Sequence, residues 1–181
     1  SAAFAYAVMS FLMTATPINM HVIEYYSLNK TGIVIQLHIV SMFLPSLITG
    51  NLLRKFGHSK IIYAGVSFFI LTILLSFLQP SFFNYLFSLI FLGIGWNFLY
   101  LSGTGLLILS YREEEKFKAQ GFNDILVFST QALASLSAGF VLSITSWKTM
   151  NLIAIPFLIL IIFTSIRADK SKQQTNKKFF S

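Results

Sequence analysis

Charged residues are scarce in this sequence, and cysteine is absent. Asp, Glu, Lys and Arg make up 10% of its 181 residues, whereas a soluble domain carries about 25%. So little charge cannot cover a water-facing surface, which excludes a soluble nucleotide-binding fold, and the apolar content excludes a disordered chain. The lack of Cys excludes a disulfide scaffold. Hydrophobic residues make up 55% of the chain, with 20 Phe among them, so the composition predicts an integral membrane protein.

Sequence motifs of enzymes are missing too. The chain has no Gly-x-Ser-x-Gly, no His-Glu-x-x-His, no Walker loop and no cluster of Cys or His. The repeated acidic signature of six-helix mitochondrial carriers is also absent. We therefore predict a protein that is not an enzyme and that uses neither a cofactor nor a metal.

The apolar residues fall into six stretches, each long enough for a helix to cross a bilayer, which takes roughly 20 residues. No period-2 alternation indicates a membrane β-barrel, so helices must satisfy the backbone in lipid. We predict an all-α integral membrane protein whose six transmembrane helices lie at about residues 2–20, 33–53, 61–78, 82–109, 122–144 and 147–166. The remaining residues, 167–181, form a polar, Lys-rich tail that we expect to be disordered.

The basic residues are distributed unevenly along this topology. Eleven of the 13 Lys and Arg lie in the connections 54–60 and 112–118 or in the tail, which share one side of the membrane. Lys30 and Lys148 alone fall on the other side. The positive-inside rule puts the eleven in the cytoplasm, so both ends of this segment are predicted to be cytoplasmic. The net charge of +7 is thereby explained by topology, with weak attraction to anionic lipid, and predicts no nucleic-acid partner.

The connection between the second and third stretches reads Gly50-Asn-Leu-Leu-Arg54-Lys-Phe-Gly57-His-Ser-Lys60. It resembles the signature of the major facilitator superfamily, in which a Gly and a Leu precede acid–base residues, a second Gly and basic residues. That signature lies between the second and third helices of each six-helix half, which is its position here. Arg54 stands where the full signature has Asp, a departure common in second halves.

Four more strings resemble a bacterial branch of the same superfamily. They are Met13–Pro17, Leu37–Gly50, Gly93–Phe98 and Gln120–Asp124. The resemblance covers nearly the whole chain except the tail. It implies the seventh to twelfth helices of a twelve-helix secondary transporter of the bacterial cytoplasmic (inner) membrane, with an amino-terminal six-helix half as partner. The start without Met or a charged leader, which excludes a signal peptide, fits this expectation of a fragment.

Polar or Met-bearing stripes follow helical spacing in the first, second, fourth and fifth stretches. The resemblance implies that these four helices line a central cavity. The cavity candidates are Thr16, His38, Met42, Trp96, Asn97, Tyr100 and Gln131. The alternative is that small polar residues and glycines serve helix packing, that His38 is a hydrogen-bonded packing residue and that Trp96 fills a gap.

A second group of candidates concerns a gate or coupling to protons: Gly50, Arg54, Gly57, Gly121 and Asp124. Asp124 is the only acid predicted inside a span and could carry a coupling proton. In the alternative, it lies in the first turn of its helix, where the free amides favour an anion. The resemblance implies that this helix end abuts the signature loop of the other half, with Gly121 permitting close approach. Pro17 and Pro45 are expected to bend their helices.

The function implied is alternating-access transport of a small solute, either proton-coupled or facilitative. No Lys or Arg is predicted within a span, which favours a neutral or cationic solute over an obligate anion. The alternative from another class is a non-transporting six-helix remnant or scaffold that binds a partner.

Overall fold

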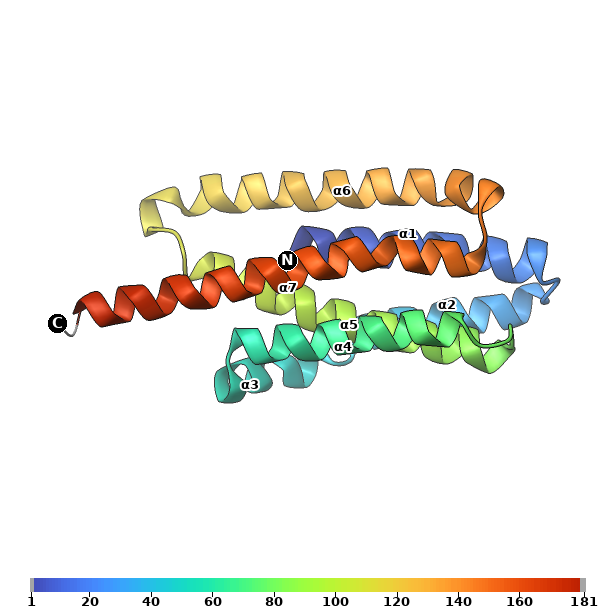
Figure 1. Cartoon of the computed structure of the whole chain (residues 1–181), viewed down its shortest axis with the longest axis horizontal. Coiled ribbons are helices and arrows are strands. Elements are labelled where there is room, and N and C mark those ends of the chain that lie inside the picture. The colour runs from blue at the N-terminus through green and yellow to red at the C-terminus, as the bar shows by residue number, and fades with distance from the viewer. Residues whose placement is uncertain (1, 180–181) are drawn as a thin grey trace.

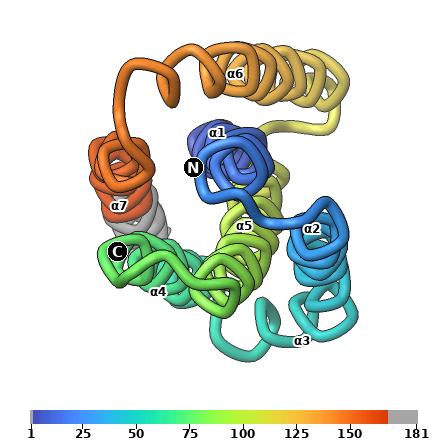
Figure 2. Tube along the Cα trace, turned by 90° about the vertical axis from the view of Figure 1, so that its right-hand side faces the viewer, coloured from blue at the N-terminus to red at the C-terminus, as the bar shows by residue number. Residues whose placement is uncertain are grey.

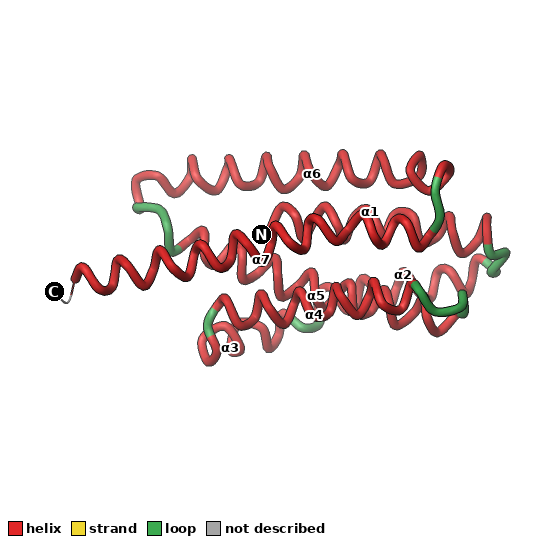
Figure 3. The backbone as a smooth tube through the Cα atoms, in the orientation of Figure 1, coloured by secondary structure: helices red, strands yellow, loops and turns green. Residues whose placement is uncertain are grey.

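The protein is a bundle of long α-helices that run side by side (Figure 1). The computed structural model describes the backbone of residues 2–179 and the side chains of residues 2–167. Helices joined by short connections account for nearly all of the described residues, and these contain no strand (Figure 3). The predicted all-α class is therefore confirmed.

Within residues 2–179, the elements are seven α-helices and two short turns of other helical types. They are α1 (Ala2–Ile18), a π-helical turn (Asn19–Ile23), α2 (Leu28–Phe43), α3 (Ser46–Phe56), α4 (His58–Ser76), α5 (Phe82–Ile108), a 3₁₀ turn (Glu113–Glu115), α6 (Lys116–Ile144) and α7 (Trp147–Phe179). Five of these are long and apolar enough to cross a membrane alone. Helices α2 and α3 make a sixth candidate as one span bent by 40°. The chain is a multi-pass membrane protein.

The bend between α2 and α3 falls at Pro45, as the sequence predicts. Proline has no N–H to donate and its ring clashes with the preceding turn, so α2 ends at Phe43 and α3 begins at Ser46. Pro17 acts differently, because α1 continues past it into the π-helical turn. Gly57 then ends α3 with φ +82°, a backbone conformation that favours glycine, and α4 starts at the next residue.

Two helix ends differ most from the sequence expectation. Helix α6 begins at Lys116, six residues before residue 122, because good helix formers follow the 3₁₀ turn and carry the helix into the apolar stretch. Helix α7 continues to Phe179, since neither Gly nor Pro follows residue 166 to end it. The side chains of residues 168–181 lie outside the described part of the chain, and the disorder expected of this tail stays a prediction.

Seen along the bundle, α1 and α5 lie between the other helices (Figure 2). Helices α4 and α7 lie on one side of this central pair and α2 lies on the opposite side, whereas α6 lies beyond α1. The contact between α4 and α5 is close because glycines face each other across it: a Cβ added at Gly65 on α4 would lie 3.0 Å from Gly95 O on α5. Small residues at such crossings allow helix backbones to approach in lipid.

Candidate functional site

Five aromatic side chains from four helices form one cluster, which we call the aromatic cluster. It consists of Tyr6 on α1, Phe43 at the end of α2, Trp96 and Tyr100 on α5, and Phe128 on α6. Trp96 and Tyr100 stack in parallel, with ring centroids 5.1 Å apart and an angle of 7° between the ring planes. Tyr6 meets both rings edge-on, at 5.1 and 5.5 Å. Both arrangements are favoured by the charge distribution of aromatic rings.

The aromatic cluster lies on the side of the bundle formed by α1, α2, α5 and α6. Helices α4 and α7, on the opposite side in Figure 2, contribute none of its rings. Trp96 at its centre is 4% exposed, whereas Phe43 and Phe128 at its edges are 61% and 57% exposed. The cluster therefore presents an aromatic surface on a face that the described part of the chain leaves uncovered.

Polar groups of α6 border this surface. Asp124 and Gln131 lie one turn before and one turn after Phe128, on the same face of the helix. The Asp124 carboxylate is exposed and close enough to the Tyr100 hydroxyl to interact with it electrostatically. Gln131 is half-buried, and no described side chain hydrogen-bonds its amide. The arrangement can stack a flat ring and offer hydrogen bonds to its edge.

The structure brings together three of the predicted cavity residues, Trp96, Tyr100 and Gln131, and separates them from Thr16 and Met42. Thr16 is fully buried and its Oγ1 donates to Leu12 O of its own helix at 2.8 Å. Met42 packs in the hydrophobic core and is 7% exposed. These two side chains pack within the bundle, as the packing alternative predicts for Thr16.

Asn97 was also predicted to line the cavity, but its side chain is enclosed between helices. It is 2% exposed, and its Nδ2 donates to Met42 O at 2.8 Å and to Ser46 Oγ at 2.6 Å. Its Oδ1 accepts from Thr49 Oγ1 at 2.8 Å. The break at Pro45 leaves backbone carbonyls without helical donors, and a neighbouring helix must supply them in lipid. Asn97 therefore connects α5 to both sides of the α2–α3 bend.

His38 matches the alternative interpretation of a hydrogen-bonded packing residue. Its side chain is fully buried between α2 and α5, with Nδ1 2.7 Å from Leu89 O. A carbonyl can only accept, so Nδ1 carries the proton. Within the described residues Nε2 has no partner, and the proton-coupling role stays a prediction.

All of the gate candidates except the half-buried Gly57 lie at exposed positions. Gly50 on α3 and Gly121 on α6 are exposed, and a Cβ at either would meet nothing within 4 Å. Arg54 is exposed and its Nη2 donates to Asn51 Oδ1 on the same helix. Gly57 provides the positive φ that joins α3 to α4.

The capping interpretation of Asp124 is wrong. Helix α6 begins at Lys116, which places Asp124 eight residues further along. Only the first four amides of a helix lack intrahelical partners, so they lie too far from this carboxylate to be capped by it. Its described hydrogen bond is with Asn123 Nδ2 at 3.4 Å.

Sequence reasoning missed Tyr6, Phe43 and Phe128. Aromatic residues are 16% of the chain, so a single Phe or Tyr carries no signal by itself. The four-residue spacing of Asp124 and Phe128 was available and could have placed Phe128 on the polar stripe of its helix. The contributions from the other two helices required the tertiary arrangement.

The fold and site define a polytopic membrane protein with an uncovered aromatic face, the class to which solute transporters belong. The chain belongs to the Major Facilitator Superfamily, whose sequence model matches residues 1–181. It is similar to the riboflavin transporter RfnT of Brucella anthropi, with 36% identity over 93% of this chain and 42% of that protein.

Two proteins of Bacillus subtilis are also similar, and both are named as uncharacterized MFS-type transporters. The chain is 33% identical to YddS over 87% of its own length and 36% of that protein. It is 32% identical to YdeG over 81% of its own length and 34% of that protein. The chain thus spans about two fifths or less of the length of these curated relatives. No solved structure matches it.

Proposed function

We propose that this chain is the carboxy-terminal six-helix half of a transporter that moves a small solute by alternating access, either coupled to protons or facilitative. Family membership supports transport, and the short span relative to its relatives supports an amino-terminal half as partner. The uncovered face of α1, α2, α5 and α6 then forms one wall of a cavity between the halves. The charge distribution supports a bacterial inner-membrane protein with both ends of this segment in the cytoplasm.

The aromatic cluster carries the proposal for the solute, a planar aromatic heterocycle of the flavin kind. The exposed rings of Phe43 and Phe128, which are held by the stacked and edge-on rings around Trp96, provide an aromatic surface, and stacking tolerates any planar ring system. Gln131 and the Tyr100 hydroxyl lie where they can bond the polar edge of such a ring. The relative of Brucella anthropi is named a riboflavin transporter, which supports the same class of solute.

A cytoplasmic gate completes the proposed mechanism. Gly121 and Asp124 leave the surface of α6 open at the end where the cytoplasmic side is expected. The signature loop of the amino-terminal half would close against Gly121, with a basic residue of that loop pairing with Asp124. The connection that carries Gly50, Arg54 and Gly57 would close in the same way against the amino-terminal half.

Uptake into liposomes that contain the complete protein tests the solute class. We expect riboflavin to be transported and lumichrome, which keeps the flat ring without the sugar chain, to compete for it, whereas ribitol does not. Phe128→Leu removes a ring from the edge of the cluster and is expected to weaken uptake several-fold.

Phe140→Leu is the matched control, because Phe140 is an exposed ring on the same helix outside the cluster. Its uptake is expected to equal that of the unchanged protein. Equal losses in the two variants, or competition by ribitol but not by lumichrome, would show that the cluster does not bind the solute.

A further inference from the structure

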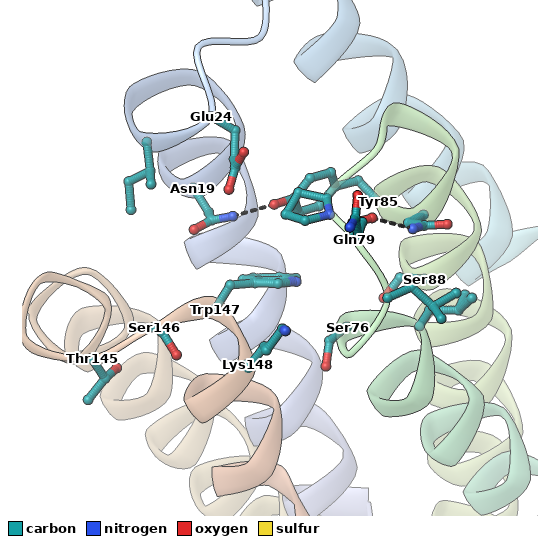
Figure 4. A pocket seen from close by; sticks show the side chains of 15 residues that line it. Asn19, Glu24, Ser76, Gln79, Tyr85, Ser88, Thr145, Ser146, Trp147 and Lys148 are labelled. Atoms are coloured by element: carbon teal, nitrogen blue, oxygen red, sulfur yellow. Dashed lines mark hydrogen bonds between the residues drawn. The ribbon is translucent and has the colours of Figure 1, made fainter.

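A pocket lies at the end of the bundle opposite the predicted cytoplasmic side. Its volume is about 280 Å³, and three connections meet around it: the π-helical turn after α1, the α4–α5 loop and the α6–α7 link (Figure 4). We call it the end pocket. None of the residues of the aromatic cluster lines it, so it is separate from the proposed solute site.

Two opposite charges line the end pocket, although charge is scarce in this chain. Glu24 is the only acid in the three connections that meet here, and Lys148 is one of two basic residues predicted on this side of the membrane. They lie on opposite sides of Trp147 in Figure 4. Within the described residues, neither side chain forms a hydrogen bond or an ion pair. Both charges therefore remain available to a ligand.

The wall beside Glu24 is aromatic and fixed in position. Tyr85 and Trp147 have ring centroids 5.6 Å apart, and Asn19 Nδ2 donates to Tyr85 Oη at 2.5 Å. Glu24 and Tyr85 both line the pocket (Figure 4). A carboxylate next to aromatic faces is a favourable environment for an ammonium group.

The wall beside Lys148 favours an anion. Ser146 Oγ accepts from Thr149 N at 3.2 Å and caps α7, and Lys148 lies in the first turn of that helix. The first amides of a helix and its dipole attract negative charge, which adds to the attraction of the Lys148 ammonium. An anionic oxygen is therefore favoured at this end of the pocket.

We infer that the end pocket binds a zwitterion, with an ammonium group at Glu24 and the rings of Tyr85 and Trp147, and an anionic oxygen at Lys148 and the start of α7. The volume is at the lower limit of small-molecule pockets, which suits a phosphoethanolamine group. Such a group is supplied by the headgroup of a membrane lipid or by a free small molecule. The experiment separates the two sources.

Thermal unfolding of the complete protein in detergent tests this site. We expect phosphatidylethanolamine to raise Tm by about 5 °C at saturation, and phosphatidylglycerol, which lacks the ammonium, to leave Tm unchanged. A rise with free O-phosphoethanolamine as well identifies a soluble ligand, and a rise with the lipid alone identifies a headgroup site. No rise with either probe, or an equal rise with phosphatidylglycerol, overturns the inference.

Three variants place the effect in the pocket. Glu24→Gln and Lys148→Met each remove one charge, and each is expected to weaken the response to phosphatidylethanolamine about tenfold in apparent affinity. Lys30→Met is the control, since it removes a basic residue of the same predicted side that does not line the pocket. If Lys30→Met weakens the response as much as Lys148→Met, the effect is general surface charge and the inference fails.

Discussion

Helices α5 and α6 are similar in length but differ in their surroundings. Eleven residues of α5 are buried, against three of α6, although α6 is the longer helix at 29 residues to 27. Helix α5 lies next to α1, α2 and α4, whereas α6 packs mainly along α1 (Figure 2). Both carry polar stripes at helical spacing. Asn97 of the α5 stripe binds α2 and α3 within the bundle, and the stripe of α6 remains on the uncovered face.

A polar residue inside a predicted span either bonds neighbouring helices within the bundle or faces an uncovered surface. The residue type does not show which of the two applies. Asn97 and Gln131 both carry a side-chain amide, yet the first is enclosed by three hydrogen bonds and the second has none among the described residues. The number of neighbouring helices decides between these uses. Matched substitutions on the two helices test this difference directly.

Substitution of a glycine on each of the two helices is expected to give the largest difference in stability. A Cβ at Gly93 would overlap Ser41 Oγ and would lie 2.9 Å from His38 O and 3.0 Å from Met42 N, which are backbone atoms that cannot yield. Gly93→Ala is therefore expected to destabilise the complete protein by about 3 kcal/mol and to lower its membrane abundance.

Gly121→Ala is the matched change on α6. Its Cβ would meet nothing, and alanine favours a helix by about 1 kcal/mol over glycine, so abundance and Tm are expected to stay level or rise. Immunoblots of membranes and thermal unfolding in detergent measure both variants. Equal abundance of the two would mean that the α2–α5 crossing does not need its glycine.

Substitution of the side-chain amides of Asn97 and Gln131 is expected to give the next largest difference in stability. Asn97→Ala leaves Met42 O and Ser46 Oγ without the amide donor that they share at the Pro45 bend, which we expect to cost about 2 kcal/mol of stability. Gln131→Ala removes no described hydrogen bond, so abundance is expected to be unchanged, whereas a lost bond to the solute weakens transport several-fold. Uptake normalised to membrane abundance separates the two effects. A stable Asn97→Ala variant with weak uptake would restore Asn97 to the cavity.

The all-α class, the presence of several membrane-spanning helices and the bend at Pro45 could be predicted because each depends on local sequence. Apolar runs, proline chemistry and the absence of breaking residues act within a few turns of one helix. The helix ends were harder to predict from the sequence. The sequence from Lys116 to Gly121 is polar enough to look like a loop, yet it continues α6 without a break, which overturned the capping interpretation of Asp124.

The site was only partly predictable, because it depends on contacts between helices. Helical spacing found Tyr100 and Gln131 as members of stripes, and Trp96 was selected separately as a ring deep in its span. The spacing also selected Asn97, whose side chain binds α2 and α3 instead of facing open space. Whether a stripe is covered depends on which helices lie beside it. Tyr6 joins the cluster from α1, and no pattern within α1 indicates that partnership.

The smallest expected effect concerns Asp124, the exposed acid of α6. In the proposed gate its carboxylate pairs with a basic residue of the other half when the cytoplasmic side is closed, so Asp124→Asn is expected to favour the inward-open state by about 1 kcal/mol without loss of abundance. Cysteine accessibility reports this shift, because the chain has no native Cys. If Asp124 instead carries the coupling proton, the same variant loses pH-dependent uptake and keeps solute exchange. Unchanged accessibility and unchanged proton-driven uptake would leave this carboxylate as a solvated side chain, because the start of α6 at Lys116 already excludes a cap.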